Sequence, residues 1–157
     1  MKKTCLLFCA ASLLVWGGCN RSGMIDSSGS SVAAGGTSAG AGPAKTATPV
    51  RISHGQEVSI QDYVVPGKTT IFDFTSEYCG PCRAIAPLLH KLHSDRADVV
   101  VVEVDINRPG IGSIDWGSPV ARQYDLHSVP NFKVYGPNGK LQADGEEAYG
   151  LVNNMVR

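Results

Sequence analysis

Two cysteines separated by two residues, Cys79-Gly80-Pro81-Cys82, form the motif of this chain with the clearest chemistry. A β-branched and aromatic stretch precedes the motif and an amphipathic stretch follows it, so the first cysteine is expected at the N-terminus of a helix. Unpaired backbone N–H groups and the helix dipole favour a thiolate at that position. We therefore expect Cys79 to be a nucleophile towards disulfides. Cys82, one turn further along, is expected to be less exposed and to act as the resolving thiol.

Zinc binding and a purely structural disulfide are the alternatives for these two cysteines. Half of a zinc site can be built from such a motif, but a second pair of ligands is required. His90 lies eight residues along the helix from Cys82, roughly 12 Å away at about 1.5 Å per residue, which is too far to share one ion. A bridge across two residues closes a very small loop, so it adds little stability. We expect a redox-active Cys79–Cys82 pair, with no metal and no further cofactor.

The elements that must position the dithiol alternate between strand and helix along the chain. The valine-rich run at 99–104 is typical of a parallel strand covered on both faces, and a strand, helix, strand order indicates a right-handed crossover. Turn residues at 136–139 indicate an antiparallel pair of strands. The predicted strands are 69–74, 99–104, 132–135 and 140–142, and the predicted helices are 82–93, 118–124 and 147–156. The expected fold class is α/β, with a mixed central sheet flanked by helices.

The composition gives no support to a nucleic acid as a partner. The 157 residues contain 14 Lys and Arg against 14 Asp and Glu, so the formal net charge is zero. The only basic block is Lys2-Lys3, which is too small for an electrostatic footprint. With 43% hydrophobic residues, the chain can form one ordinary globular domain plus additional sequence at one end. We expect that domain to be monomeric.

The first nineteen residues have the pattern of a signal peptide. Two lysines precede a short apolar run, Leu6 to Trp16, and two glycines then lead to Cys19. The apolar run is shorter than the roughly 18 to 20 residues that a membrane-spanning helix needs. A small residue directly before Cys19 resembles the lipobox of bacterial lipoproteins, although Trp16 stands where that motif usually has an aliphatic residue. The resemblance implies that Cys19 becomes the lipidated first residue of the mature chain.

Cysteine counting agrees with lipidation at Cys19. Cys5 and Cys9 leave with the signal peptide, and a lipid on Cys19 would leave a single dithiol in the mature protein. Ordinary cleavage before Cys19 is the alternative, and it would leave an odd third thiol in an oxidising compartment. We therefore expect an exported protein of the cell envelope or periplasm, attached to a bacterial membrane through Cys19.

Residues 20–48 are expected to form a flexible linker. They are mostly Ser, Gly, Ala and Thr and include no aromatic residue, so they cannot build a core. A flexible chain of this length has a root-mean-square span on the order of 30 Å. The predicted organisation is therefore a signal peptide at 1–19, a linker at 20–48 and a folded domain at 49–157.

The segment from Asp73 to Arg83 resembles the active-site segment of the thioredoxin family. Pro87 falls where the helix of that family kinks. The segment Ser128-Val129-Pro130 resembles the family's second active-site element, in which a cis-proline faces the dithiol. The resemblance covers about residues 50–157. It implies a thioredoxin fold and a thiol–disulfide oxidoreductase that acts on protein thiols and disulfides.

The resemblance also implies roles for individual residues. Asp73 is expected to be the buried carboxylate that moves a proton to or from the resolving thiol, and burial should raise its pKa. Pro130 is expected to adopt the cis form, and Val129 to offer its backbone to an extended substrate segment. The other residues expected to contact the substrate are Tyr78, Gly80 and Pro81.

The sequence departs from the family pattern near the dithiol. Tyr78 stands in place of the usual tryptophan and Thr75 in place of another aromatic, so the site should be less apolar. The segment from Asn107 to Trp116 is longer than the family's usual connection and is expected to shape a partner surface. The dipeptide Gly80-Pro81 resembles the reducing members, which implies a protein-disulfide reductase supplied by a membrane electron donor. The alternatives are a thiol oxidase or isomerase and a non-catalytic binding module.

Overall fold

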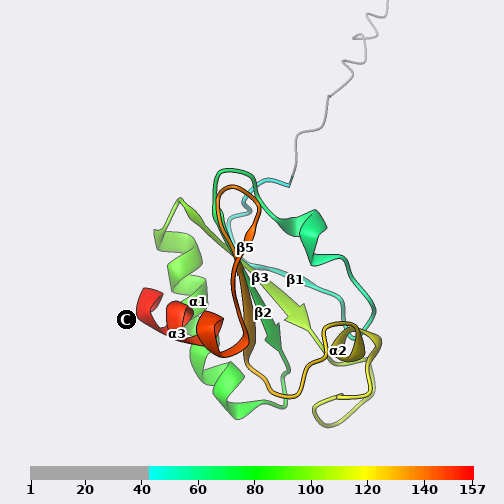
Figure 1. Cartoon of the computed structure of the whole chain (residues 1–157). Helices are drawn as coiled ribbons and strands as arrows, with labels where there is room; N and C mark the ends of the chain where they lie inside the picture. Colours follow the sequence, from blue (N-terminus) through cyan, green and yellow to red (C-terminus); the bar gives the residue numbers. More distant parts are fainter. Residues whose placement is uncertain (1–42) are drawn as a thin grey trace, which may run out of the picture. The chain divides into compact units, whose positions relative to one another are not determined.

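The computed structural model describes residues 43–157 (Figure 1). The predicted signal peptide, Cys19 and the predicted linker up to residue 42 lie outside the described residues. The elements, in chain order, are β1 (Val50–Ile52), the 3-10 helix η1 (Ile60–Tyr63), β2 (Thr69–Thr75), α1 (Gly80–Asp95), β3 (Val99–Asp105), α2 (Pro119–Gln123), β4 (Asn131–Tyr135), β5 (Leu141–Asp144) and α3 (Gly145–Met155). Within this part of the chain, no helix is long and apolar enough to cross a membrane.

The strands form one mixed sheet in the order β1-β3-β2-β4-β5. Strands β1 and β2 run parallel to β3, whereas β4 runs antiparallel to both β2 and β5. Helices α1 and α3 lie on one side of the sheet and α2 on the other (Figure 1). The predicted architecture, a mixed central sheet flanked by helices, is therefore confirmed.

Alternation along the central strands divides the core into two layers. Phe72 and Phe74 are fully buried in the layer that also contains η1 and α2. Ile71 is fully buried in the other layer, under α1 and α3. Because successive side chains of a strand point to opposite faces, Asp73 shares the face of Ile71. The sheet therefore directs Asp73 towards α1, the helix that carries Cys82.

The last residues of the predicted linker already contact the folded domain. The Lys45 ammonium donates hydrogen bonds to the carbonyls of His93 and Arg96, the second at 2.6 Å, at the C-terminal end of α1. A cation is favoured there because the helix dipole is negative at that end. The ring of His93 also binds the carbonyl oxygen of Thr46 at 3.0 Å. The packed structure thus begins before residue 49, the predicted start of the domain.

The buried imidazole of His93 links α1 by hydrogen bonds to β3 and to the segment that contains Thr46. Its side chain is fully buried, and its Nδ1 accepts a hydrogen bond from the Val101 N–H at 3.0 Å while Nε2 donates to Thr46. A neutral imidazole has one donor and one acceptor, which matches these two contacts. Burial lowers the pKa of His93, since desolvation opposes the charged ring.

Acid should therefore destabilise the domain through His93. The folded-state pKa lies below the unfolded value of 6.5, so this stabilisation is complete above that pH and is lost as the pH falls below it. We expect His93→Leu to reduce the free energy of unfolding at pH 7.5 by about 1–3 kcal/mol, because the Val101 N–H loses its acceptor. Urea unfolding at pH 7.5 and pH 5 should show a smaller acid effect in the variant than in the wild type. Equal acid effects in both proteins would contradict this role.

Candidate active site

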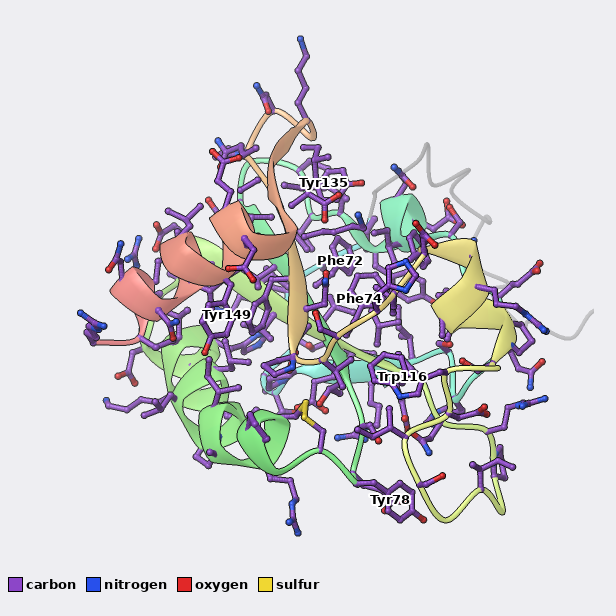
Figure 2. The ribbon with its side chains drawn as sticks, turned by 60° about the horizontal axis from the view of Figure 1, so that its bottom comes forward. Phe72, Phe74, Tyr78, Trp116, Tyr135 and Tyr149 are labelled. Carbon is purple, nitrogen blue, oxygen red and sulfur yellow. A yellow bond between two sulfur atoms is a disulfide. The ribbon has the colours of Figure 1, made fainter. Side chains whose placement is uncertain are left out.

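The dithiol lies where β2 gives way to α1. Strand β2 ends at Thr75, and α1 begins at Gly80 with Cys79 as its N-cap residue. Pro81 occupies the first turn of α1, where its missing N–H costs no hydrogen bond. Cys79 and Cys82 are joined in a disulfide, which Figure 2 shows at the end of α1. The chain thus places both sulfur atoms at the positive end of a helix.

Cys79 is more deeply covered than the sequence predicted. Its side chain folds back onto α1, where Sγ accepts a hydrogen bond from the Cys82 N–H at 3.1 Å. The same sulfur lies 3.5 Å from the carbonyl oxygen of Val129. Only 3% of Cys79 and 1% of Cys82 are exposed, so the expected contrast in exposure between the two cysteines is absent from the oxidised form. A partner must therefore approach Cys79 Sγ through the space between Val129 and the start of α1.

A groove of about 450 Å³ runs beside the disulfide. The peptide bond between Val129 and Pro130 is cis, and both residues line the groove together with Pro81. Tyr149 of α3 lines the far wall and is 40% exposed. The remaining lining residues are polar or small: Asp125, His127, Ser128, Asn131, Gly145 and Glu146. The predicted substrate residues Pro81, Val129 and Pro130 therefore meet in one groove.

Tyr78 and Gly80 do not line that groove. Tyr78 is 44% exposed and points away from the disulfide (Figure 2). Gly80 is also exposed, at the first position of α1. These two predicted substrate residues therefore flank Cys79 in sequence but lie outside the groove.

Asp73 is buried beneath α1 with no polar contact of its own. It is fully buried, and within residues 43–157 neither of its carboxylate oxygens has a hydrogen-bond partner. Burial is the largest cause that raises the pKa of Asp73 from 3.8 to about 8, the negative charge of Glu103 raises it further, and Arg51 opposes both. A carboxyl group in this setting can hold or release a proton near neutral pH.

Glu103 is a second buried carboxylate that sequence reasoning did not single out. It is the register partner of Asp73 on the neighbouring parallel strand and is only 6% exposed. Its Oε2 accepts a hydrogen bond from Arg51 Nε at 3.0 Å, and its Oε1 lies 2.6 Å from His90 Nε2. The available signal was a single acid inside the valine-rich run at 99–104, at the strand position that faces α1.

The segment from Asn107 to Trp116 forms a braced loop. The Arg108 guanidinium contacts both oxygens of the Asp115 carboxylate, at 2.6 and 3.0 Å, and Asp115 is buried. Asn107 Nδ2 donates a hydrogen bond to the Ser113 carbonyl. Trp116 is nevertheless 42% exposed and lines a second groove of about 310 Å³, which shares Asp125 and His127 with the groove beside the disulfide. The loop thus holds an aromatic side chain next to the active-site face.

Between residues 43 and 157, no group of three or more His, Cys, Asp or Glu side chains is arranged to bind a metal ion.

Comparison with known proteins shows one family for most of the described residues. A family model described as Thioredoxin matches residues 54–156. Thioredoxin of Gallus gallus is 33% identical over 93 residues, which is 57% of this chain and 81% of that protein. Among solved structures, the short form of spinach chloroplast thioredoxin f has a TM-score of 0.50 and 21% identity, and the match covers 72% of this chain and 94% of that one. Thioredoxin f2 in a complex with ferredoxin:thioredoxin reductase also has a TM-score of 0.50 and 21% identity, covering 71% and 96%.

Proposed function

This chain belongs to the thioredoxin family of thiol–disulfide oxidoreductases, and from that membership we propose that it is a protein-disulfide reductase working outside the cytoplasm. The observation that carries the proposal is the pair Cys79 and Cys82 at the N-terminus of α1, beside the Val129 carbonyl and an open groove. That arrangement supplies a nucleophile, a resolving thiol and a place for the partner.

The first step is attack by Cys79 on a partner disulfide. The Cys79 thiolate forms a new S–S bond with one partner sulfur, and the other partner sulfur leaves as a thiolate that takes a proton from water. The N-terminus of α1 stabilises the attacking thiolate, because the Cys82 N–H points at Cys79 Sγ. The groove beside Val129 and Pro130 holds the partner as an extended segment during this step.

The second step is resolution by Cys82. Its thiol passes its proton to the Asp73 carboxylate, and the resulting thiolate attacks Cys79 Sγ. The mixed disulfide breaks, the partner leaves with its second thiol, and Cys79 and Cys82 remain joined. Two electrons have then moved from the dithiol to the partner. When an electron donor later reduces the Cys79–Cys82 disulfide, protonated Asp73 returns a proton to the leaving Cys82 sulfur.

The direction and place of the reaction complete the proposal. The dipeptide Gly80-Pro81 between the cysteines supports a reducing member of the family, and outside the cytoplasm such a protein needs a membrane electron donor. The signal-peptide pattern at 1–19 and the position of Cys19 support export and attachment through a lipid. A monomer held near a membrane in this way can exchange electrons both with the donor and with exported proteins.

Catalysed reduction of a protein disulfide tests the direction. The chain from residue 20 onward, added in trace amounts to a disulfide-bonded protein with dithiothreitol as electron source, should accelerate reduction well above dithiothreitol alone. Cys79→Ser is the matched control and should give no acceleration. Faster oxidation of a reduced protein by the Cys79–Cys82 disulfide than reduction of an oxidised one would instead support the thiol oxidase or isomerase.

A further inference from the structure

Two carboxylates, Asp73 and Glu103, lie side by side in the sheet beneath the dithiol helix. They are Cα register partners on the parallel strands β2 and β3, so their side chains point to the same face. Both residues are buried, and α1 covers that face. We propose that Glu103 is a positioning residue of the redox site that keeps the proton on Asp73. Arg51 and His90 hold Glu103 in place, and the positive charge of Arg51 partly offsets the effect of Glu103 on Asp73. The proposal rests on the proposed function, in which Asp73 exchanges a proton with Cys82.

Glu103 is bound by side chains from two other elements, β1 and α1. Arg51 reaches its Oε2 from β1 at 3.0 Å, and His90 reaches its Oε1 from α1 at 2.6 Å. The Arg51 and His90 side chains are 43% and 52% exposed, whereas that of Glu103 is 9% exposed. Both Glu103 oxygens are therefore fixed by donors that are themselves in contact with water.

Asp73 lacks any comparable partner. Its register partner on β4 is Phe132, an apolar ring. Within the described part of the chain, both Asp73 oxygens are buried without a hydrogen bond. The negative charge of Glu103 makes ionisation of Asp73 unfavourable, since two like charges in a shared buried site oppose each other.

Arg51 acts on Asp73 in the opposite sense to Glu103. Arg51 lowers the pKa of Asp73, because its positive charge favours the carboxylate. Arg51 is also shared with Asp105, whose Oδ2 lies 3.4 Å from Nη1, and Asp105 in turn lies 3.6 Å from His54 Nδ1. The electrostatic effect on Asp73 therefore combines the negative charge of buried Glu103 with the positive charge of Arg51. Arg51 is in turn linked through Asp105 to the surface residue His54.

This balance has a direct consequence for the reaction. Reduction of the Cys79–Cys82 disulfide needs a protonated Asp73 to give a proton to the leaving sulfur. Resolution of a mixed disulfide needs the same residue ionised. Glu103 therefore favours the protonated Asp73 that reduction by the electron donor needs. Removing the charge of Glu103 should favour the ionised Asp73 that resolution of the mixed disulfide with the substrate needs.

Titration of the Asp73 carboxyl carbon by NMR tests the proposal in the oxidised protein. In the chain from residue 20 onward, Glu103→Gln should lower the Asp73 midpoint by about one pH unit or more. Arg51→Gln should raise it. Glu57→Gln removes the same charge from an exposed position and should leave the midpoint where it is in the wild type. Shifts of opposite sign distinguish an electrostatic role from loosened packing, because loosening admits water and lowers the midpoint in every variant.

An unchanged Asp73 midpoint in Glu103→Gln, or a fall in Arg51→Gln, would overturn the proposal. If Glu103→Gln does not fold, Arg51→Gln alone still decides, because only a rise agrees with the proposed balance. The titration needs neither partner nor turnover, so its failure leaves the reductase proposal intact. Opposite shifts in a protein that does not reduce disulfides would instead remove the reductase proposal and leave the coupling of the two carboxylates.

Discussion

Replacing Cys82 with serine is expected to turn the catalyst into a trap for its partners. Cys79 and the helix N-terminus that stabilises its thiolate remain, so attack on a partner disulfide continues. Serine cannot resolve the mixed disulfide, so the prereduced variant, freed of dithiothreitol, should accumulate the covalent complex and release no fully reduced partner. Non-reducing electrophoresis and intact mass should show one partner bound per chain, released by dithiothreitol.

The matched control for this trap is Cys79→Ser. This variant keeps the groove beside Val129 and Pro130 but has no nucleophile, so it should capture no partner covalently. Release of fully reduced partner by prereduced Cys82→Ser in the absence of dithiothreitol would contradict the assignment of the resolving thiol. Non-covalent partner binding that survives in a variant with both cysteines changed to serine, together with full biological activity, would support the binding module.

Replacing Asp73 with asparagine should have the second-largest effect on catalysis. The amide fills nearly the same volume but cannot accept the Cys82 proton. Resolution of the mixed disulfide should therefore slow by about a hundredfold, which is the lower end of what general acid–base catalysis contributes. The wild-type rate of mixed-disulfide resolution should rise with pH around 8, where Asp73 ionises. In the variant, the rate should rise only as the Cys82 thiol itself ionises, without the contribution of Asp73. Stopped-flow measurement of resolution between pH 6 and pH 9 would show both effects, and a variant with the wild-type pH profile would contradict the role.

The same substitution should change how stability depends on pH. The pKa of Asp73 is raised from 3.8 to about 8 on folding, so the folded protein binds the extra proton between these values. Stability from this group is complete below about pH 4 and is lost as the pH rises towards 8. We expect the wild type to lose on the order of 6 kcal/mol more than Asp73→Asn across this range. Urea unfolding of both proteins at several pH values measures the difference, and parallel curves would contradict the buried carboxyl.

The elements with a periodic pattern or a clear turn or capping signal were predictable from the sequence, including the short helix α2, whereas β1 and η1 were not. Repeating apolar positions revealed β2, α1 and β3, and turn residues revealed the pair β4 and β5. Strand β1 spans Val50–Ile52 and η1 spans Ile60–Tyr63, and neither is long enough to show a period. Helix α1 begins at Gly80 rather than the predicted Cys82, because Cys79 caps it and Pro81 fits its first turn.

The predicted site residues came together only in part. Periodicity and the family resemblance pointed to Asp73, the two cysteines and the segment at Val129, because each is tied to a local motif. Glu103 was missed as a site residue, because its role depends on contacts with Arg51 and His90 on other elements. Cys79 was expected to be exposed but is covered by the Val129 segment, a contact between residues 50 positions apart.

The redox equilibrium of the Cys79–Cys82 pair against glutathione tests the central claim most directly. The chain from residue 20 onward would be equilibrated at a series of glutathione ratios, its free thiols alkylated, and the reduced fraction read by mass. A protein-disulfide reductase predicts full, reversible cycling of two thiols with a potential near about −270 mV, whereas a value near about −120 mV would mark an oxidant. A pair that did not cycle at any ratio would contradict thiol–disulfide exchange as the function of this site.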